Sequence, residues 1–295
     1  KYQSVPEYFR DCYNLGVNGN PIFPEVYTRP ATAAGASILA GKMLSEQTEG
    51  IIYSIGGGTH HAQKAKASGF CFFNDIVLGI LEMLDNGIER VLYVDLDAHH
   101  GDGVQDAFVD DDRVFTISIH EEGRWPRTGD LTDRSSGAAR NLPVPKGFND
   151  SELNEIILKA ILPLGLRFRP EAIVIQMGCD GLADDPQSKL ELSNLALWKA
   201  LKHLTQLASR VLVVGGGGYN PWATARAWSG VWATLNNIDP VINLPLEATD
   251  VLKSLTWKHS RGRNPPQHWY YSIADKPNCG IVRDAILTII EEVLK

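Results

Sequence analysis

The segment VLYVDLDAHHGDG (residues 91–103) constrains this chain more than any other part of it. Its apolar and β-branched start predicts a buried strand, and the segment then places Asp95, Asp97 and His99 at alternate positions. Alternate residues of an extended chain point to the same face, so these side chains would lie together if the strand continues that far. Carboxylates and an imidazole on one buried face are costly unless a cation neutralises them. The segment therefore predicts a metal site.

The rest of the chain alternates short apolar runs with longer amphipathic segments, which is typical of strand–helix–strand units. We expect one α/β domain with three layers, in which helices cover both faces of a mainly parallel sheet, because the strands are apolar nearly throughout. The predicted strands are residues 51–54, 91–95, 114–119, 172–177 and 211–214. The predicted helices are approximately residues 32–45, 74–86, 151–166, 193–208 and 221–235.

Composition limits the class of protein. The chain has 295 residues, of which 44% are hydrophobic, and a formal net charge of −7. This charge argues against nucleic acid or an anionic membrane as the main partner and is compatible with a basic substrate. The four cysteines are scattered without a C-x-x-C pair, which favours a reducing, cytoplasmic compartment. The sequence contains neither an apolar run of transmembrane length nor a signal-peptide pattern.

Reactive side chains follow the carboxyl ends of four predicted strands, which is where open α/β sheets build their sites. His60 and His61 follow the first of these strands, and the acidic segment described above follows the second. Asp180 follows the fourth, and the fifth leads into four glycines and Tyr219. We therefore expect these side chains to converge on one edge of the sheet.

Two carboxylates and one imidazole, from Asp97, His99 and Asp180, form the candidate ligand set. Three protein ligands leave a position open for water or substrate, as a catalytic zinc site requires. This oxygen-rich set would also hold Fe(II) or another divalent ion. The alternative, that these are solvated loop residues, is reasonable for Asp180 alone but weak for the whole cluster.

Paired histidines beside a metal suit proton transfer, because an imidazole titrates near neutral pH. His60 and His61 each need an acidic partner that fixes the tautomer, and Asp95 and Asp102 are the candidates. Tyr219 would be able to donate a hydrogen bond to a developing oxyanion, although a structural role fits the sequence equally well. Neither glycine run matches a nucleotide-binding fingerprint.

The runs GGGTHHAQKAKASGFCFFND, VLYVDLDAHHGDGVQDAF, QMGCD and GGGGYN occur in this order. Together they resemble the zinc-dependent histone deacetylase family, above all its bacterial acetoin-utilization-type and amidohydrolase-like members. The resemblance extends from about Tyr13 to Trp232 and implies an arginase/deacetylase-like fold. It also implies hydrolysis of acyl groups on lysine side chains or similar amines. We expect residues 1–295 to form one deacetylase domain that lacks the family's N-terminal strand region.

The resemblance assigns a role to individual residues. The implied zinc ligands are Asp97, His99 and Asp180. The implied proton-transfer and oxyanion groups are His61 with Asp102, His60 with Asp95, and Tyr219. The implied walls of the acyl channel are Gly69, Phe70, Trp125 and Gly217. Two structural potassium ions are also implied, the first at Asp95, Asp97, His99, Ser118 and Ile119 and the second at Phe108, Asp111 and Val114.

Three positions depart from the family pattern, and each bears on the substrate. Thr59 stands where a large apolar residue is usual, beside the cavity that releases acetate. Asn18 falls near the rim aspartate that grips the substrate backbone in many members, which weakens the case for a peptide-like substrate. Gln187 replaces a leucine or methionine of the channel wall.

Three other functions remain as alternatives. An arginase-type ureohydrolase requires a second metal, but Gly101 and Leu182 occupy the positions of its additional aspartates. A non-catalytic acyl-lysine binder is disfavoured because every matched position is occupied. An acetylpolyamine deacetylase requires an acidic gate, for which Glu25, Glu121 and Glu122 are available. The substrate stays open between acetylated lysines of proteins, such as an acyl-CoA synthetase, and acetylated small amines. A homo-oligomer is compatible with the sequence.

Overall fold

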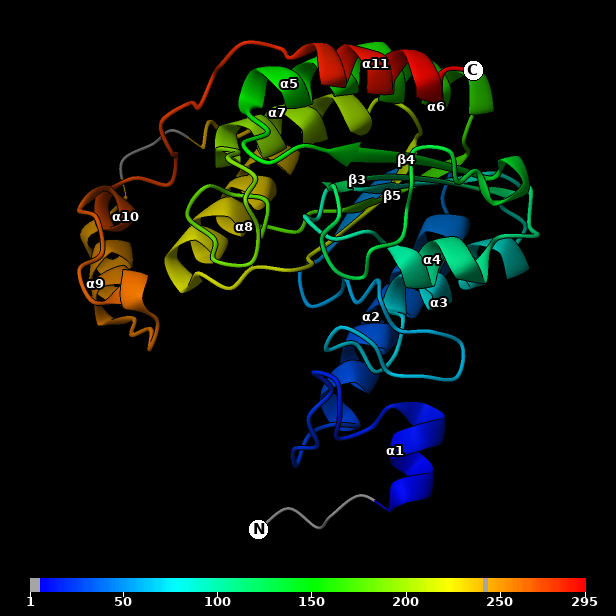
Figure 1. The fold of residues 1–295 in the computed structure, drawn as a ribbon, viewed down its shortest axis with the longest axis horizontal. Helices are drawn as coiled ribbons and strands as arrows, with labels where there is room; N and C mark the ends of the chain where they lie inside the picture. Colours follow the sequence, from blue (N-terminus) through cyan, green and yellow to red (C-terminus); the bar gives the residue numbers. More distant parts are fainter. Residues whose placement is uncertain (1–5, 241–243) are drawn as a thin grey trace.

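The centre of the protein is a six-stranded sheet in a computed structural model that describes residues 6–240 and 244–295 (Figure 1). The strands are β1 (Gly50–Ser54), β2 (Val91–Asp95), β3 (Val114–Glu121), β4 (Ala139–Val144), β5 (Ala172–Gln176) and β6 (Arg210–Val214). Their order is β1-β6-β5-β2-β3-β4, and each neighbouring pair is parallel. The predicted α/β class is confirmed, and the sheet is parallel throughout.

Helices cover both faces of the sheet, which gives the three predicted layers (Figure 1). One face carries α2 (Thr28–Ser45), α3 (Asp75–Asp85) and α4 (Asp102–Ala107). The other carries α5 (Asp150–Ile156), α6 (Leu162–Phe168), α7 (Asn194–Leu204), α8 (Pro221–Leu235) and α11 (Asp284–Val293). Each face of the sheet has its own hydrophobic core, and successive side chains of β2 alternate between the two. Leu92 and Val94 pack on the face that carries α5 to α8 and α11, and Val91 and Tyr93 pack on the face that carries α2 to α4.

Three short helices lie outside these layers. Helix α1 (Glu7–Tyr13) projects from the body at the N-terminal end (Figure 1) and buries none of its residues. Helices α9 (Leu246–Ser254) and α10 (His268–Tyr271) form a small separate core with Trp222 of α8. Among the described residues, no helix combines the length and the hydropathy needed to cross a bilayer.

Side-chain caps explain where several helices begin. Asn74, Ser193 and Asn220 each accept hydrogen bonds from backbone N–H groups of the first turn of α3, α7 and α8. These groups have no partner within the helix, so the caps stabilise the helix start. Pro221 occupies the first turn of α8, where its missing N–H costs nothing.

Strand β2 covers the predicted residues 91–95 and does not continue to His99, so Asp97 and His99 lie in the loop that follows it. Strand β4 was not predicted, because its sequence ARNLPV mixes polar residues with a proline that is compatible only with an edge position. The helix predicted at residues 151–166 is present but contains a π-helical turn at Ile157–Ile161 and continues to Phe168.

Close packing between α7 and α8 yields a prediction about stability. Gly230 of α8 lies against the indole ring of Trp198, which leaves no room for a β-carbon, whereas Gly35 of α2 faces open space. We predict that Gly230→Ala lowers the free energy of unfolding by about 1–3 kcal/mol through overpacking. Gly35→Ala should raise it by about 0.5–1 kcal/mol, because alanine loses less backbone entropy in a helix. Denaturant titration compares the two variants, and effects of the same sign would contradict the packing argument.

Candidate active site

Three candidate metal ligands lie together at the carboxyl edge of the sheet. They are Asp97, His99 and Asp180, and the term metal cluster denotes these three side chains. The loop after β2 carries Asp97 and His99, and the loop after the neighbouring strand β5 carries Asp180. His99 Nδ1 is 3.1 Å from Asp97 Oδ1 and 2.9 Å from Asp180 Oδ2. Both carboxylates are at most 1% exposed. The sequence prediction that these three side chains meet therefore agrees with the geometry, although loops and not strand alternation bring them together.

The hydrogen bonding of this cluster fits a divalent metal. Asp180 Oδ2 is buried and accepts no hydrogen bond within the described part of the chain, although the imidazole of His99 faces it. Burial and the nearby charge of Asp97 raise the pKa of Asp180 to about 7. A carboxylate that resists ionisation for these reasons becomes stable as an anion beside a cation. The three residues thus have the arrangement of a metal site.

Neutral groups hold the two carboxylates in place. Gln176 Nε2 and the backbone N–H of Gly217 donate to Asp97 Oδ2, both at 2.9 Å. The backbone N–H of Ala98 donates to Asp180 Oδ1 at 2.8 Å. A β-carbon at Gly217 would collide with both carboxylates, so only glycine allows this close approach. Sequence reasoning missed Gln176, whose one signal is a polar side chain at the end of an apolar strand.

Two histidine–aspartate pairs flank the cluster. His60 Nδ1 lies 2.7 Å from Asp95 Oδ2, and His61 Nδ1 lies 2.7 Å from Asp102 Oδ1. The two rings are adjacent, with centroids 3.9 Å apart. Both histidines reach this position because the loop after β1 is tied to the start of α3, where Asp75 accepts hydrogen bonds from the backbone of residues 58 and 59.

The two histidines differ in their protonation. Burial opposes a charge on His60, but the carboxylates of Asp95 and Asp97 outweigh it and raise its pKa to about 9. Burial and the positive charge of His60 lower the pKa of His61 to about 4. His61 is therefore neutral near pH 7 and has a free ring nitrogen that can accept a proton, which is what a general base requires.

Tyr219 lies just beyond the end of β6, in the glycine-rich loop. Burial and the negative charges of Asp180 and Asp97 raise the pKa of its phenol above the usual value. The hydroxyl consequently keeps its proton at neutral pH and remains a hydrogen-bond donor. Its position near two metal-cluster carboxylates agrees with the predicted convergence of the loops.

Comparisons with known proteins agree with this geometry. A family model for the histone deacetylase domain matches residues 3–235. Histone deacetylase 8 of Xenopus laevis is 39% identical over 229 residues, which are 76% of this chain and 70% of that protein. Histone deacetylase HDAC1 of Drosophila melanogaster is 38% identical over 232 residues, which are 77% of this chain and 44% of that protein. The crystal structure of a histone deacetylase homologue from Aquifex aeolicus is similar with a TM-score of 0.91 at 34% identity, over 99% of this chain and 80% of that chain.

The chain belongs to the histone deacetylase family. It is a hydrolase of the deacetylase type, and the predicted family is confirmed. The chain spans less than half the length of the Drosophila relative, so the activities of such longer proteins do not transfer to it as a whole.

Aromatic side chains lie beside the candidate site, and the acyl channel they are expected to form stays a prediction. The ring of Trp125 is 4.6 Å from that of His61, and the ring of Phe70 is 6.3 Å from that of Tyr219. Phe70 has a positive φ of 67°, a strained conformation that its neighbours must stabilise. Buried Asn20 accepts a hydrogen bond from the Phe70 backbone N–H at 3.1 Å, and sequence reasoning missed it.

Gly69 occupies a position where only glycine fits. Its own φ is 53°, and a β-carbon there would meet the rings of both His61 and Trp125.

Of the three departures from the family pattern, Thr59 directs its hydroxyl to Phe73 and Asp75 in support of the histidine loop. Asn18 is exposed and donates to Asn14. The expected effects of these departures on substrate choice stay predictions.

The predicted potassium residues occupy two places. Asp95, the last residue of β2, is the register partner of Ser118 within β3, so these members of the first group lie next to the loop that carries Asp97 and His99. In the second group, a turn joins Phe108 to Asp111, and Arg113 pairs with the Asp111 carboxylate at 2.7 Å. Both potassium sites stay predictions.

His100, which has no assigned role, hydrogen-bonds Thr128 and Gln105.

A second acidic cluster consists of Asp184, His268 and Asp275. Its carboxylates already have partners, because Trp269 Nε1 donates to Asp184 and the buried Arg226 pairs with Asp275 at 2.7 Å. A guanidinium inside the cluster supplies the positive charge that a metal would otherwise bring. We therefore assign no metal to it.

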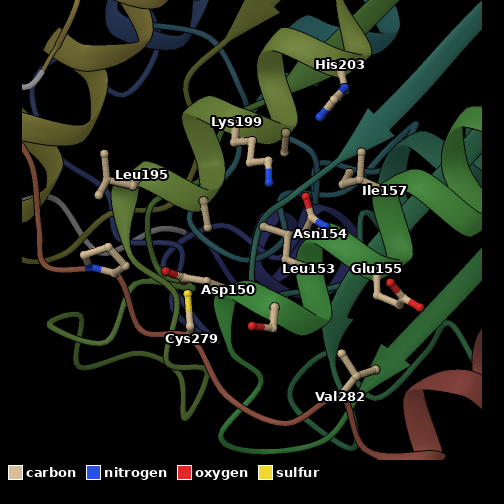
Figure 2. A pocket seen from close by; sticks show the side chains of 14 residues that line it. Asp150, Leu153, Asn154, Glu155, Ile157, Leu195, Lys199, His203, Cys279 and Val282 are labelled. Carbon is tan, nitrogen blue, oxygen red and sulfur yellow. The ribbon is translucent and has the colours of Figure 1, made fainter.

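A cavity of about 370 Å³ lies between α5 and α7, on the face of the sheet that carries these helices (Figure 2). Lys199 and His203, one turn apart on α7, line it together with Leu153, Asn154 and Cys279 (Figure 2). Among the residues that the structure describes, none of those predicted for the deacetylase site lines this cavity. This cavity is therefore separate from the candidate site at the sheet edge.

The cluster geometry leads to a prediction about metal content. Asp180→Ala removes one of three ligands and should reduce the divalent metal retained after dialysis at least about tenfold. His203→Ala, in the separate cavity, should retain the wild-type amount. Elemental analysis of the purified variants measures this, and an Asp180→Ala variant with full metal content would contradict the assignment.

Proposed function

We propose that the chain hydrolyses acetyl or related acyl amides of lysine side chains or similar amines, with a divalent metal held by Asp97, His99 and Asp180. The observation that carries this proposal is the pair of His–Asp hydrogen bonds beside the metal cluster, each 2.7 Å long. Zn²⁺ is the proposed ion, with Fe²⁺ as the alternative that the same oxygen-rich ligands would accept. When bound, it would lower the pKa of a water molecule and polarise the amide carbonyl.

The protein groups divide the remaining chemistry among them. His61, neutral at pH 7, takes a proton from the attacking water, while Asp102 fixes its tautomer and stabilises the resulting imidazolium. Tyr219 donates a hydrogen bond to the oxyanion that forms as the carbonyl is attacked. The C–N bond then breaks, and a protonated histidine gives its proton to the leaving amine. The products are a carboxylic acid anion and a free amine.

Two alternatives receive no support. An arginase-type site would use position 182 as a ligand, but Leu182 is 1% exposed and packs in the hydrophobic core. A second metal would consequently lack a carboxylate there. A binder without catalysis would not need two buried histidine–aspartate pairs beside the metal ligands. The acetoin-utilization and bacterial assignments remain predictions from the sequence motifs.

Catalytic variants test the mechanism. We predict that His61→Ala and Tyr219→Phe lower kcat for acetate release by about 10²–10³-fold, because each removes a group that acts on the transition state. Tyr53→Phe is the matched control, since its hydroxyl contacts the backbone of Trp228 and should affect turnover little. Metal content should be unchanged in all three. Full activity of both catalytic variants would refute these roles.

Charges at the entrance bear on the choice between acetyl-lysine and acetylpolyamine. Glu121 is 2% exposed and both its oxygens pair with Arg124, so it is not available as an acidic gate. Glu25 and Glu122 are exposed and remain candidates for such a gate. The substrate therefore stays open between acetyl-lysine and an acetylated small amine.

A substrate comparison decides between the two, because the ratio of kcat/KM for an acetyl-lysine peptide to that for acetylputrescine measures the preference. If Glu122 forms the gate, Glu122→Gln should lower kcat/KM for acetylputrescine several-fold at low ionic strength, and added salt should reduce the difference. Glu247→Gln, also exposed but on α9, is the charge-matched control. An unchanged value in Glu122→Gln would exclude this residue as the gate.

A further inference from the structure

We propose that Asp185 is a positioning residue that holds Tyr219 in place relative to the metal cluster. This inference rests on the proposed role of Tyr219. Asp185 is 1% exposed, and its Oδ2 accepts hydrogen bonds from the backbone N–H groups of Tyr219 at 2.6 Å and Asn220 at 3.2 Å. Its Oδ1 accepts from the backbone N–H of Gln187 at 2.9 Å. One buried carboxylate thus joins two loops.

The glycine-rich loop requires such an anchor. Four glycines precede Tyr219, and glycine restricts the backbone less than any other residue. Strand β6 ends at Val214 and α8 begins at Pro221, so the intervening loop gains no support from regular secondary structure. A phenol that stabilises an oxyanion must be fixed to within a fraction of an ångström. External hydrogen bonds must therefore define its position.

The two halves of this loop are held by different partners. The first half contacts the metal-cluster loops directly, since the Gly217 N–H donates to Asp97 and its carbonyl accepts from the Cys179 N–H at 2.6 Å. The second half, which carries the phenol, is held by Asp185 and by Asn220, whose Nδ2 donates to the Asp184 carbonyl at 3.0 Å. Asp185 is the group that accepts from the backbone N–H of Tyr219 itself, so without it the chain between Gly217 and Asn220 would lose its central attachment.

Asp185 is itself fixed to the loop that carries a metal ligand. Its backbone N–H donates to the Leu182 carbonyl at 2.9 Å. Ser188 Oγ donates to the Asp180 carbonyl at 2.6 Å, which closes the loop between ligand and anchor. Arg261 donates to the Asp185 carbonyl at 3.2 Å. The spacing between the candidate metal ligand Asp180 and Tyr219 is thereby set through a compact, hydrogen-bonded segment.

The test combines two substitutions with a matched control. Asp185→Ala removes all three acceptor bonds, and Asp185→Asn keeps the side-chain volume in case the alanine variant folds poorly. Asp150 is the control, because it is also buried and accepts from the backbone N–H groups of Ser193 and Asn278, at the start of α7 and in the C-terminal segment. Asp150→Ala reports the cost of losing a buried carboxylate elsewhere.

A double-mutant cycle with Tyr219→Phe is the decisive measurement. We expect Asp185→Ala to lower kcat about 10–100-fold with little change in KM or metal content, and Asp185→Asn to lower it less. In the Tyr219→Phe background, Asp185→Ala should change kcat less than about twofold. Asp150→Ala should have the same effect in both backgrounds. Equal effects of Asp185→Ala in both backgrounds, or loss of metal, would overturn the inference.

Hydrogen exchange supplies a readout that does not depend on activity. The peptide spanning residues 215–222 should exchange faster in Asp185→Ala than in the wild type, because the N–H groups of Tyr219 and Asn220 lose their acceptor. Asp150→Ala should leave this peptide unchanged. Unchanged exchange in Asp185→Ala would refute the anchoring. A wild type that releases no acetate would refute the proposed function, and the exchange measurement would still test the anchoring.

Discussion

Buried negative charge at the carboxyl edge of the sheet is the constraint on which the rest of the structure depends. Asp95, Asp97 and Asp180 are each at most 1% exposed, and their mutual repulsion would destabilise the fold if nothing compensated it. Histidines, backbone N–H groups and the expected cation supply that compensation. The loops after β1, β2, β5 and β6 converge at this edge because each brings one of these compensating groups.

Much of this arrangement could be predicted because it follows from short-range patterns. Apolar runs such as residues 172–176 have few alternatives to a buried parallel strand, and the polar groups follow these runs directly. Strand β4 escaped prediction because its pairing with β3 depends on tertiary contacts that outweigh its weak local propensity. Asn20 and Asp185 escaped for a related reason, since both act on backbone N–H groups distant in sequence.

Asp97 and His99 meet although the strand before them ends at Asp95, so alternation along a strand is not what brings them together. They lie in a loop, where their geometry depends on Gln176 of β5 and on Gly217 in the loop after β6. A sequence pattern specifies which groups are available at a strand end. It does not specify the backbone path that orients them, because that path is set by hydrogen bonds from other strands.

Buried aspartates of this chain fall into three kinds according to their partners. Asp75 and Asp185 are satisfied largely by backbone N–H groups, and they hold the loops that carry His60 and Tyr219. Asp95 and Asp102 face imidazoles, and they set the tautomer and charge of those rings. Asp97 and Asp180 both face the imidazole of His99, and Asp180 retains a buried oxygen without a hydrogen bond among the described residues. Asp97 is fully hydrogen-bonded, so it is the kind of partner and not satisfaction alone that separates anchor, proton-transfer partner and candidate metal ligand within one residue type.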